Sequence, residues 1–192
     1  MDASGFDFTR RMRHVIDDMV QRLPELSHID SSRVALSFAQ ARKRSHYGVY
    51  ATLTPMRFTG GQLTTTRRGR SYTVQRLYDS SGREILYILT FYLPRFMEVD
   101  LNEKLVTILH ELWHISPEFD GDIRRHEGRC YAHSHSQQQY DAGMQRLADR
   151  WIAGAPPPQL FGFLQLNFTQ LRDRFGRVYG TRIPHPKLLP CG

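Results

Sequence analysis

Cysteine is scarce in this sequence, and that scarcity narrows the class of protein. Only Cys130 and Cys191 occur among the 192 residues, which is too few for the disulfide framework that stabilises small secreted domains. A chain of this length can instead fold around a hydrophobic core. Since free cysteines persist in reducing compartments, we expect a cytoplasmic protein with one main domain.

Long apolar runs and a targeting segment are also missing. The longest apolar stretch runs from Ile85 to Leu93, whereas a helix that spans a bilayer needs about 20 residues. Residues Met1–Asp7 show neither the charged start nor the apolar run of a signal peptide. Hydrophobic residues make up 40% of the chain and charged residues 23%, as in ordinary globular domains. These features predict a soluble protein without a membrane partner.

Lysine is rare, although the chain is basic. The 26 lysine and arginine residues outnumber the 19 acidic residues and give a net charge of +7. Lysine itself occurs only at Lys43, Lys104 and Lys187. The arginine-rich segments Arg42–Arg44 and Arg67–Arg70, with Tyr72 as a stacking residue, are either solvated loops or a surface for polyanions. Nucleic acid is therefore a candidate partner, although the sequence contains no recognisable nucleic-acid-binding motif.

Hydrophobic periodicity predicts a helix followed by several strands. Apolar residues at helical spacing indicate an amphipathic helix that begins after Thr9, its expected N-cap, and ends before Pro24. Alternating or continuous apolar residues then predict strands at 34–38, 47–54, 71–78 and 84–93. The last strand is the most apolar and should be the most buried. A hairpin tip is expected at Arg67–Arg70.

Two further helices are predicted in the second half of the chain. Asp100 and Glu103 resemble a capping box, and Pro117 limits the helix that follows them. A second helix is expected from about Asp122 to Ile152, either continuous or broken near His135. Gly154–Pro158 is a rigid break. We therefore divide the chain into a domain at 1–154 and an extension at 155–192, whose apolar residues should pack back on the domain.

The first of these helices contains the sequence His110-Glu111-Leu112-Trp113-His114. Histidines four residues apart project from the same helix face, so both imidazoles can bind one metal ion. Zinc lowers the pKa of a bound water to about 7, and the neighbouring Glu111 can take its proton. This spacing is typical of zinc metallopeptidases and predicts Glu111 as the general base.

A catalytic zinc site commonly has a third protein ligand and one open position. The metzincin pattern requires glycine where this chain has Pro117, so that turn is excluded. His126 is our first candidate, because a turn between Pro117 and Gly121 would let the next helix fold back and bring His126 toward the metal. The alternatives are His133, Asp120 and Glu127.

Other side chains near the motif have candidate roles. Tyr131 or Tyr140 could stabilise a tetrahedral oxyanion, or could simply pack in the core. Asp120 and Asp122 could orient a ligand histidine, or Asp122 could cap the following helix. Cys130 is either a fourth ligand or a buried thiol.

The segments His110–Ile115, Phe119–Gly121 and His126–Tyr131 together resemble the phage metallopeptidase family and, more distantly, the SprT-like metalloproteases. The resemblance implies a zincin-like fold, zinc ligands at His110, His114 and His126, and Glu111 as base. It also places Tyr131 at an aromatic position of the family. Many SprT-like proteins continue into a cysteine-rich zinc ribbon, which this chain cannot form with Cys191 alone, so the DNA-linked roles of that family are not carried over.

The complete prediction is an α+β, zincin-like fold. A small mixed or antiparallel sheet should pack on the N-terminal helix and on the helix with the HExxH motif. An edge strand from residues 47–78 would accept an extended peptide or protein substrate. The predicted function is hydrolysis of peptide bonds by a Zn²⁺-activated water. The alternative is a non-catalytic binding module stabilised by zinc through four protein ligands, for instance with Cys130 or His133, and associated with nucleic acid.

Overall fold

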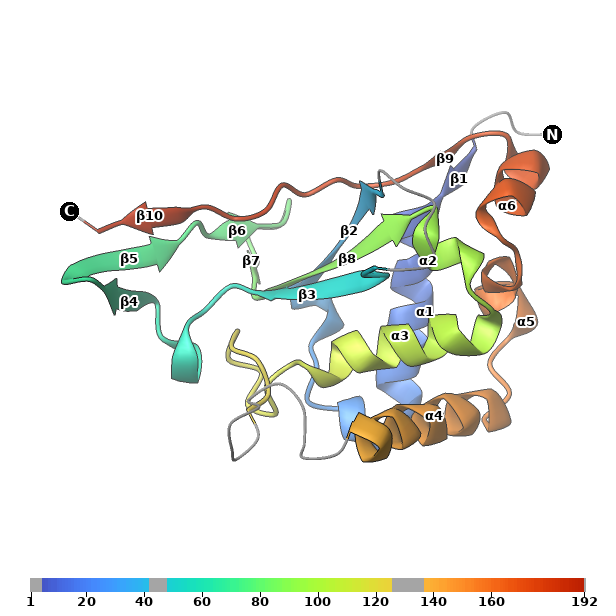
Figure 1. The fold of residues 1–192 in the computed structure, drawn as a ribbon, viewed down its shortest axis with the longest axis horizontal. Coiled ribbons are helices and arrows are strands. Elements are labelled where there is room, and N and C mark those ends of the chain that lie inside the picture. Colours follow the sequence, from blue (N-terminus) through green and yellow to red (C-terminus); the bar gives the residue numbers. More distant parts are fainter. Residues whose placement is uncertain (1–4, 42–47, 126–136, 192) are drawn as a thin grey trace.

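The computed structural model describes residues 5–41, 48–125 and 137–191, with the side chains of 137–141 also left out of the description. Residues 126–136 lie outside the described residues. This segment holds several candidates named above: His126, Glu127, Cys130, Tyr131 and His133. The part of the chain that is described nevertheless contains the sheet, the motif helix and the C-terminal extension (Figure 1).

A three-stranded mixed sheet forms the centre of the fold. Its strands are β2 (Val34–Gln40), β8 (Tyr87–Leu93) and β3 (Ala51–Pro55), in the order β2-β8-β3. Strand β8 is parallel to β2 and antiparallel to β3. Because β8 has a neighbour on each side and is almost wholly apolar, it is the most buried strand, as predicted from its sequence. Strand β3 lies at the edge.

Helices cover one face of this sheet. In Figure 1, α1 (Phe8–Arg22) and α3 (Leu101–Trp113) lie against the strands, and α4 (Gln137–Ala153) packs on α3. The inward side of α1 is fully buried at Met12, Val15, Ile16 and Met19. Burial of each such side chain contributes about 1.5–3 kcal/mol of hydrophobic stabilisation.

Two expectations about helix starts are wrong. The N-cap of α1 is Asp7, whose carboxylate accepts a hydrogen bond from the Arg10 N–H at 3.0 Å, and Thr9 lies inside the helix. The predicted helix from Asp122 does not begin there, because residues 122–125 are not helical and Ile123 forms a β-bridge with Ile115. The capping function predicted for Asp100 is confirmed, since its carboxylate accepts from the Glu103 N–H at 2.8 Å.

Shorter elements connect and extend this centre. A second sheet, in the order β10-β5-β4, projects to one side of the molecule (Figure 1). It consists of β4 (Thr64–Arg67), β5 (Arg70–Val74) and β10 (Leu188–Pro190). The remaining strands pair as β6 (Leu77–Tyr78) with β7 (Glu84–Ile85) and as β1 (Phe6–Asp7) with β9 (Val178–Tyr179). The remaining helical turns are η1 (Pro24–Leu26), η2 (Ser31–Arg33), η3 (Thr59–Gly61), α2 (Arg95–Glu98), α5 (Pro158–Phe161), η4 (Gly162–Gln165) and α6 (Phe168–Phe175).

The C-terminal residues contact the main core. Phe163, Leu164 and Leu171 are buried in the same hydrophobic cluster as α1 and β8. The fully buried Lys104 of α3 donates hydrogen bonds to the carbonyl oxygens of Leu164 and Leu166 at 2.8 and 3.0 Å. Burial lowers the pKa of Lys104 to about 8. These contacts tie the extension to the motif helix, while the division at residue 154 stays a prediction.

The prediction of an α+β, zincin-like fold is confirmed. A small mixed sheet packs on the N-terminal helix and on the helix that carries the motif. Among the described helices, none has both the length and the apolar composition needed to cross a bilayer.

Candidate active site

Helix α3 presents the motif because its two sides differ. Leu105, Ile108, Leu109 and Leu112 are buried at 2% exposure or less and fix the helix against the core. The motif residues His110, Glu111 and His114 are half-buried on the remaining surface. The helix ends at Trp113 with His114 as its C-cap, so the motif occupies the final turns of the helix.

The two motif histidines face each other. Their Nε2 atoms are 3.0 Å apart, and the ring planes lie at 81°. Two nitrogen ligands of one tetrahedral zinc, each at about 2.0–2.1 Å from the ion, are separated by about 3.3 Å. The histidine pair therefore fits a single metal ion with only a small adjustment of the side chains.

The third motif residue, Glu111, points to the edge of the sheet. Its carboxylate accepts a hydrogen bond from the backbone N–H of Leu53 in β3. Burial raises the pKa of Glu111 to about 7, and the Leu53 hydrogen bond opposes this rise. The carboxylate thus lies between the motif helix and the edge strand. Leu53 could not be predicted as a contact of Glu111, since the alternation of a strand does not reveal which helix the strand will meet.

The chain after α3 turns back to the motif. Ile115 and Ile123 form an antiparallel bridge, and the Arg124 N–H donates to the carbonyl oxygen of His114 at 2.7 Å. The Arg124 guanidinium also stacks over the Trp113 ring at 4.2 Å from its centroid. Residues just before position 126 are therefore attached to the end of α3.

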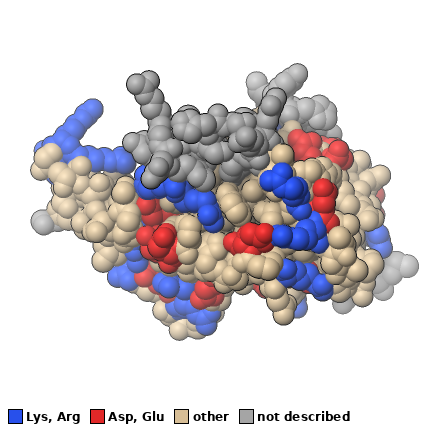
Figure 2. Space-filling view, turned by 90° about the horizontal axis from the view of Figure 1, so that it is seen from below, with Lys and Arg blue, Asp and Glu red and all other residues tan. Residues whose placement is uncertain are grey.

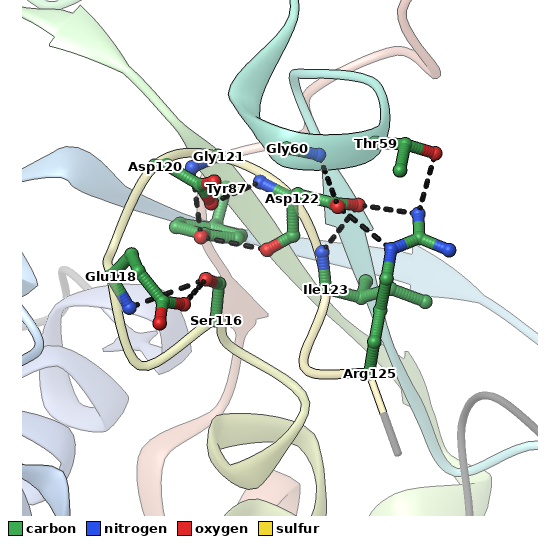
Figure 3. A network of polar contacts seen from close by, with 10 residues as sticks. All are labelled: Thr59, Gly60, Tyr87, Ser116, Glu118, Asp120, Gly121, Asp122, Ile123 and Arg125. Carbon is green, nitrogen blue, oxygen red and sulfur yellow. Dashed lines mark hydrogen bonds and ion pairs between the residues drawn. The ribbon is translucent and has the colours of Figure 1, made fainter. Parts of the chain in front are cut away.

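A buried tyrosine of β8 holds this loop in place (Figure 3). The Tyr87 hydroxyl donates to the carbonyl oxygen of Asp122 and accepts from the Gly121 N–H, both at 2.9 Å. The side chain is fully buried, which raises its pKa. Gly121 has φ of 90°, and a Cβ there would lie 2.5 Å from Cγ of Arg57. The loop thus needs glycine at this point.

The carboxylate of Asp122 joins the loop to η3 (Figure 3). It accepts from the backbone N–H of Gly60 at 2.9 Å and from Nε of Arg125 at 2.9 Å. Arg125 also donates to the Thr59 hydroxyl at 3.0 Å. Burial alone would raise the pKa of Asp122, but the hydrogen bonds from Arg125, Gly60 and Ile123 outweigh it and lower the pKa. Asp122 is therefore not a helix cap, and we find it bound to Arg125 and backbone donors.

Asp120 does not join the histidine pair. Its carboxylate accepts from the Asp122 N–H at 3.0 Å, and the described residues contain no group of three histidine, cysteine or acidic side chains placed to hold a metal. Among the described residues, Asp120 is thus not grouped with the two histidines, and its role as an alternative third ligand stays a prediction. His126, Glu127, His133, Cys130 and Tyr131 lie outside the described residues, as does the side chain of Tyr140.

A paired-histidine helix beside the edge strand of a mixed sheet is typical of a metallopeptidase domain with the HExxH motif. The model of the family described as "Putative phage metallopeptidase" matches residues 8–150, more than half of the chain, and the chain belongs to this family. The predicted family membership is thereby confirmed. No curated protein and no solved structure gives a significant match. Membership implies a divalent metal and a peptide or protein substrate.

Proposed function

We propose that this protein hydrolyses peptide bonds with a zinc ion held by His110, His114 and His126, and with Glu111 as general base. The observation that carries the proposal is the 3.0 Å approach of the two Nε2 atoms beside a carboxylate of the same helix. When bound at such a site, zinc lowers the pKa of water and polarises a carbonyl group. Glu111 would accept a proton from the attacking water and return it to the leaving amine.

The third ligand is proposed from the direction of the chain. The hydrogen bond from the Arg124 N–H to the His114 carbonyl fixes the backbone two residues before His126 at the end of α3. The Arg125 side chain is held by Asp122 and Thr59. His126 is the first metal-binding residue type after this anchor, which supports it over His133 and Glu127. Tyr131 stays our candidate for stabilising the oxyanion.

The edge strand β3 offers a backbone surface to the substrate. The Tyr92 N–H donates to the Tyr50 carbonyl, so the backbone groups of the even-numbered residues in this region point toward β8 and can form its hydrogen bonds. By alternation, the backbone groups of Ala51 and Leu53 point away from β8. An extended peptide could add to this edge by β-augmentation, with its scissile bond near Glu111. We therefore assign the predicted substrate edge to β3.

Metal analysis and peptidase assays on three variants test this proposal. Glu111→Gln should retain stoichiometric zinc, and its peptidase activity should fall about 100-fold or more, as expected for the loss of a positioned general base. Glu103→Gln, an exposed glutamate two turns earlier on α3, should retain both and serves as the matched control. His110→Ala should lose zinc.

Two results would overturn the assignment. Full activity of Glu111→Gln would remove the general base, and stoichiometric zinc in His110→Ala would remove the proposed ligand. Zinc bound through four protein ligands, without hydrolysis of any peptide in a broad panel, would instead establish the non-catalytic binding module.

A further inference from the structure

We propose that the projecting sheet binds the phosphate backbone of double-stranded DNA through Arg67, Arg68 and Arg70. We call this sheet the arginine arm and define it as β4, the turn at 68–69, β5 and β10. The arm projects from the end of the molecule opposite α6 (Figure 1). Figure 2 shows basic side chains extending from this end, at the left of the view, with no acidic side chain beside them. This proposal does not depend on the peptidase activity.

The charges of the arm are not balanced within the described residues. Arg67 and Arg70 are directly opposite each other across the two strands, where like charges destabilise a strand pair. No acidic residue occurs in residues 58–75. All three arginines are exposed, and none of their side chains forms an ion pair or hydrogen bond with the described part of the protein. A polyanion placed over the arm would relieve this repulsion.

The turn of the arm has an arginine, Arg68, at a position whose backbone conformation does not favour arginine. Arg68 has φ of 50° and Gly69 has φ of 74°, as in a two-residue hairpin turn in which asparagine is preferred before glycine. An arginine in this left-handed conformation costs the chain more than asparagine would. The turn therefore adds a third positive charge at the tip despite its conformational cost.

The neighbouring side chains are of the types that contact a nucleic-acid backbone. The register of β4 and β5 places Thr65 and Tyr72 on the same face as Arg67 and Arg70. Thr64, Thr66 and Ser71 are exposed on the other face. Arginine, serine, threonine and tyrosine are among the side chains that contact phosphate oxygens, and arginine can bind phosphate in a bidentate manner.

The shape of the arm favours a duplex over an acidic peptide. A projecting β-ribbon can enter the major groove of B-DNA, which is about 12 Å wide, whereas the deep and narrow major groove of RNA does not admit side chains. The arm is a projection from the molecule (Figure 1). The projecting shape and the arginines, whose side chains have no ion-pair partner among the described residues, together point to double-stranded DNA.

The arm is ordered before any partner binds. β10 pairs with β5 over Leu188–Pro190, and the Cys191 N–H donates to the Ser71 carbonyl at 2.9 Å. At its base, Val74 packs on the small cluster of Met56, Ile85 and Ile88. Little ordering of the backbone would therefore be needed on binding, which favours affinity.

Fluorescence anisotropy with a labelled DNA duplex of about 20 base pairs tests the proposal on the full chain. Replacement of Arg67, Arg68 and Arg70 by glutamine should weaken binding on the order of 100-fold and reduce the salt slope by about 2–3, as expected for three lost phosphate contacts. The control variant has glutamine in place of Arg10, Arg11 and Arg146, which are exposed outside the arm. This control lowers the net charge from +7 to +4 as well and should leave binding within about threefold of the wild type.

Circular dichroism should show that both triple variants are folded. In a third variant, lysine in place of the same three arm residues should restore most of the affinity for DNA. Equal losses in the arm variant and the control would show that only net charge matters and would overturn the proposal. Binding of poly-glutamate or of double-stranded RNA with equal or higher affinity than DNA would overturn it as well.

Discussion

The carboxylate of Glu84 forms ion pairs with Arg57 and Arg76. Its carboxylate lies 2.7 Å from Arg76 Nε and 2.5 Å from Arg57 Nη2, while the side chain itself is only 13% exposed. The hydrogen bond from Arg76 lowers the pKa most; burial opposes it, and Arg57 lowers it further, to about 2. The cluster links β7 to Arg57, which follows β3, and to Arg76, which follows β5.

This pKa predicts how stability depends on pH. The pKa of Glu84 is depressed on folding from 4.5 to about 2, so its stabilising contribution is present above pH 4.5 and is lost as the pH falls through about 2. Because Arg76 is partly exposed, we expect a contribution of about 1–2 kcal/mol. Urea unfolding of wild type and Glu84→Gln between about pH 2 and 7 measures it.

The two proteins should differ at neutral pH and converge toward about pH 2. Glu98→Gln, an exposed glutamate in α2, is the control and should follow the wild type. A constant difference between Glu84→Gln and wild type at every pH would contradict the charge-based explanation.

At the scale of elements, one hydroxyl of β8 contributes two of the hydrogen bonds that hold the loop after α3. Tyr87→Phe removes the group that bonds Gly121 N–H and Asp122 C=O, and leaves two buried backbone groups without this partner. Such a loss costs about 1–3 kcal/mol. We expect a lower free energy of unfolding and a lower affinity for zinc, because the loop leads from His114 to the proposed ligand His126.

Chemical denaturation and a zinc titration measure these two effects. Tyr92→Phe is a suitable control, since Tyr92 is only half-buried on the same strand and its hydroxyl makes one long contact of 3.5 Å with Thr52. If Tyr87→Phe destabilises the protein but leaves zinc affinity unchanged, the loop does not position a ligand.

Sequence periodicity was sufficient for the elements whose burial follows a simple pattern. The helices over α1 and α3 and the strands β2 and β8 were predicted, because one helix face or a whole strand is apolar. The predicted strand at 71–78 is instead divided into β5 and β6, and the one at 84–93 into β7 and β8. The helix expected from Asp122 is absent there, because Tyr87 holds residues 121 and 122 from 34 and 35 positions away in sequence. No local signal encodes such a contact.

The candidate site shows the same limit. The spacing of His110, Glu111 and His114 predicted their shared helix face, since that face follows from helix geometry alone. The contact between Glu111 and Leu53 depends on the position of β3 at the edge of the sheet, which is set by its pairing with β8. Pairing of strands far apart in sequence could not be derived from periodicity.

At the scale of the whole molecule, a metal that binds only the folded chain should raise its melting temperature. Zinc at about 100 times its dissociation constant would add about 2.7 kcal/mol, which corresponds to roughly 5–10 °C for a domain of this size. Differential scanning fluorimetry with zinc, magnesium and a chelator measures this shift. His110→Ala should show no response to zinc.

A wild-type protein whose melting temperature responds to neither zinc nor another divalent ion would contradict a metal site. An equal zinc response in His110→Ala would place the ion elsewhere. Since the arginine arm lies apart from α3 in Figure 1, its triple variant should retain the full zinc response and separates the two proposals.

The pairing of β10 with β5 also bears on the order in which the protein is made. The third strand of the arm follows every other described element in the chain, so a ribosome completes α3 and the central sheet well before it delivers β10. Folding during synthesis proceeds from the N-terminal side. The nascent chain would thus hold its motif helix in place while the arm is still a two-stranded hairpin, and the arm would reach its final form only when β10 emerges.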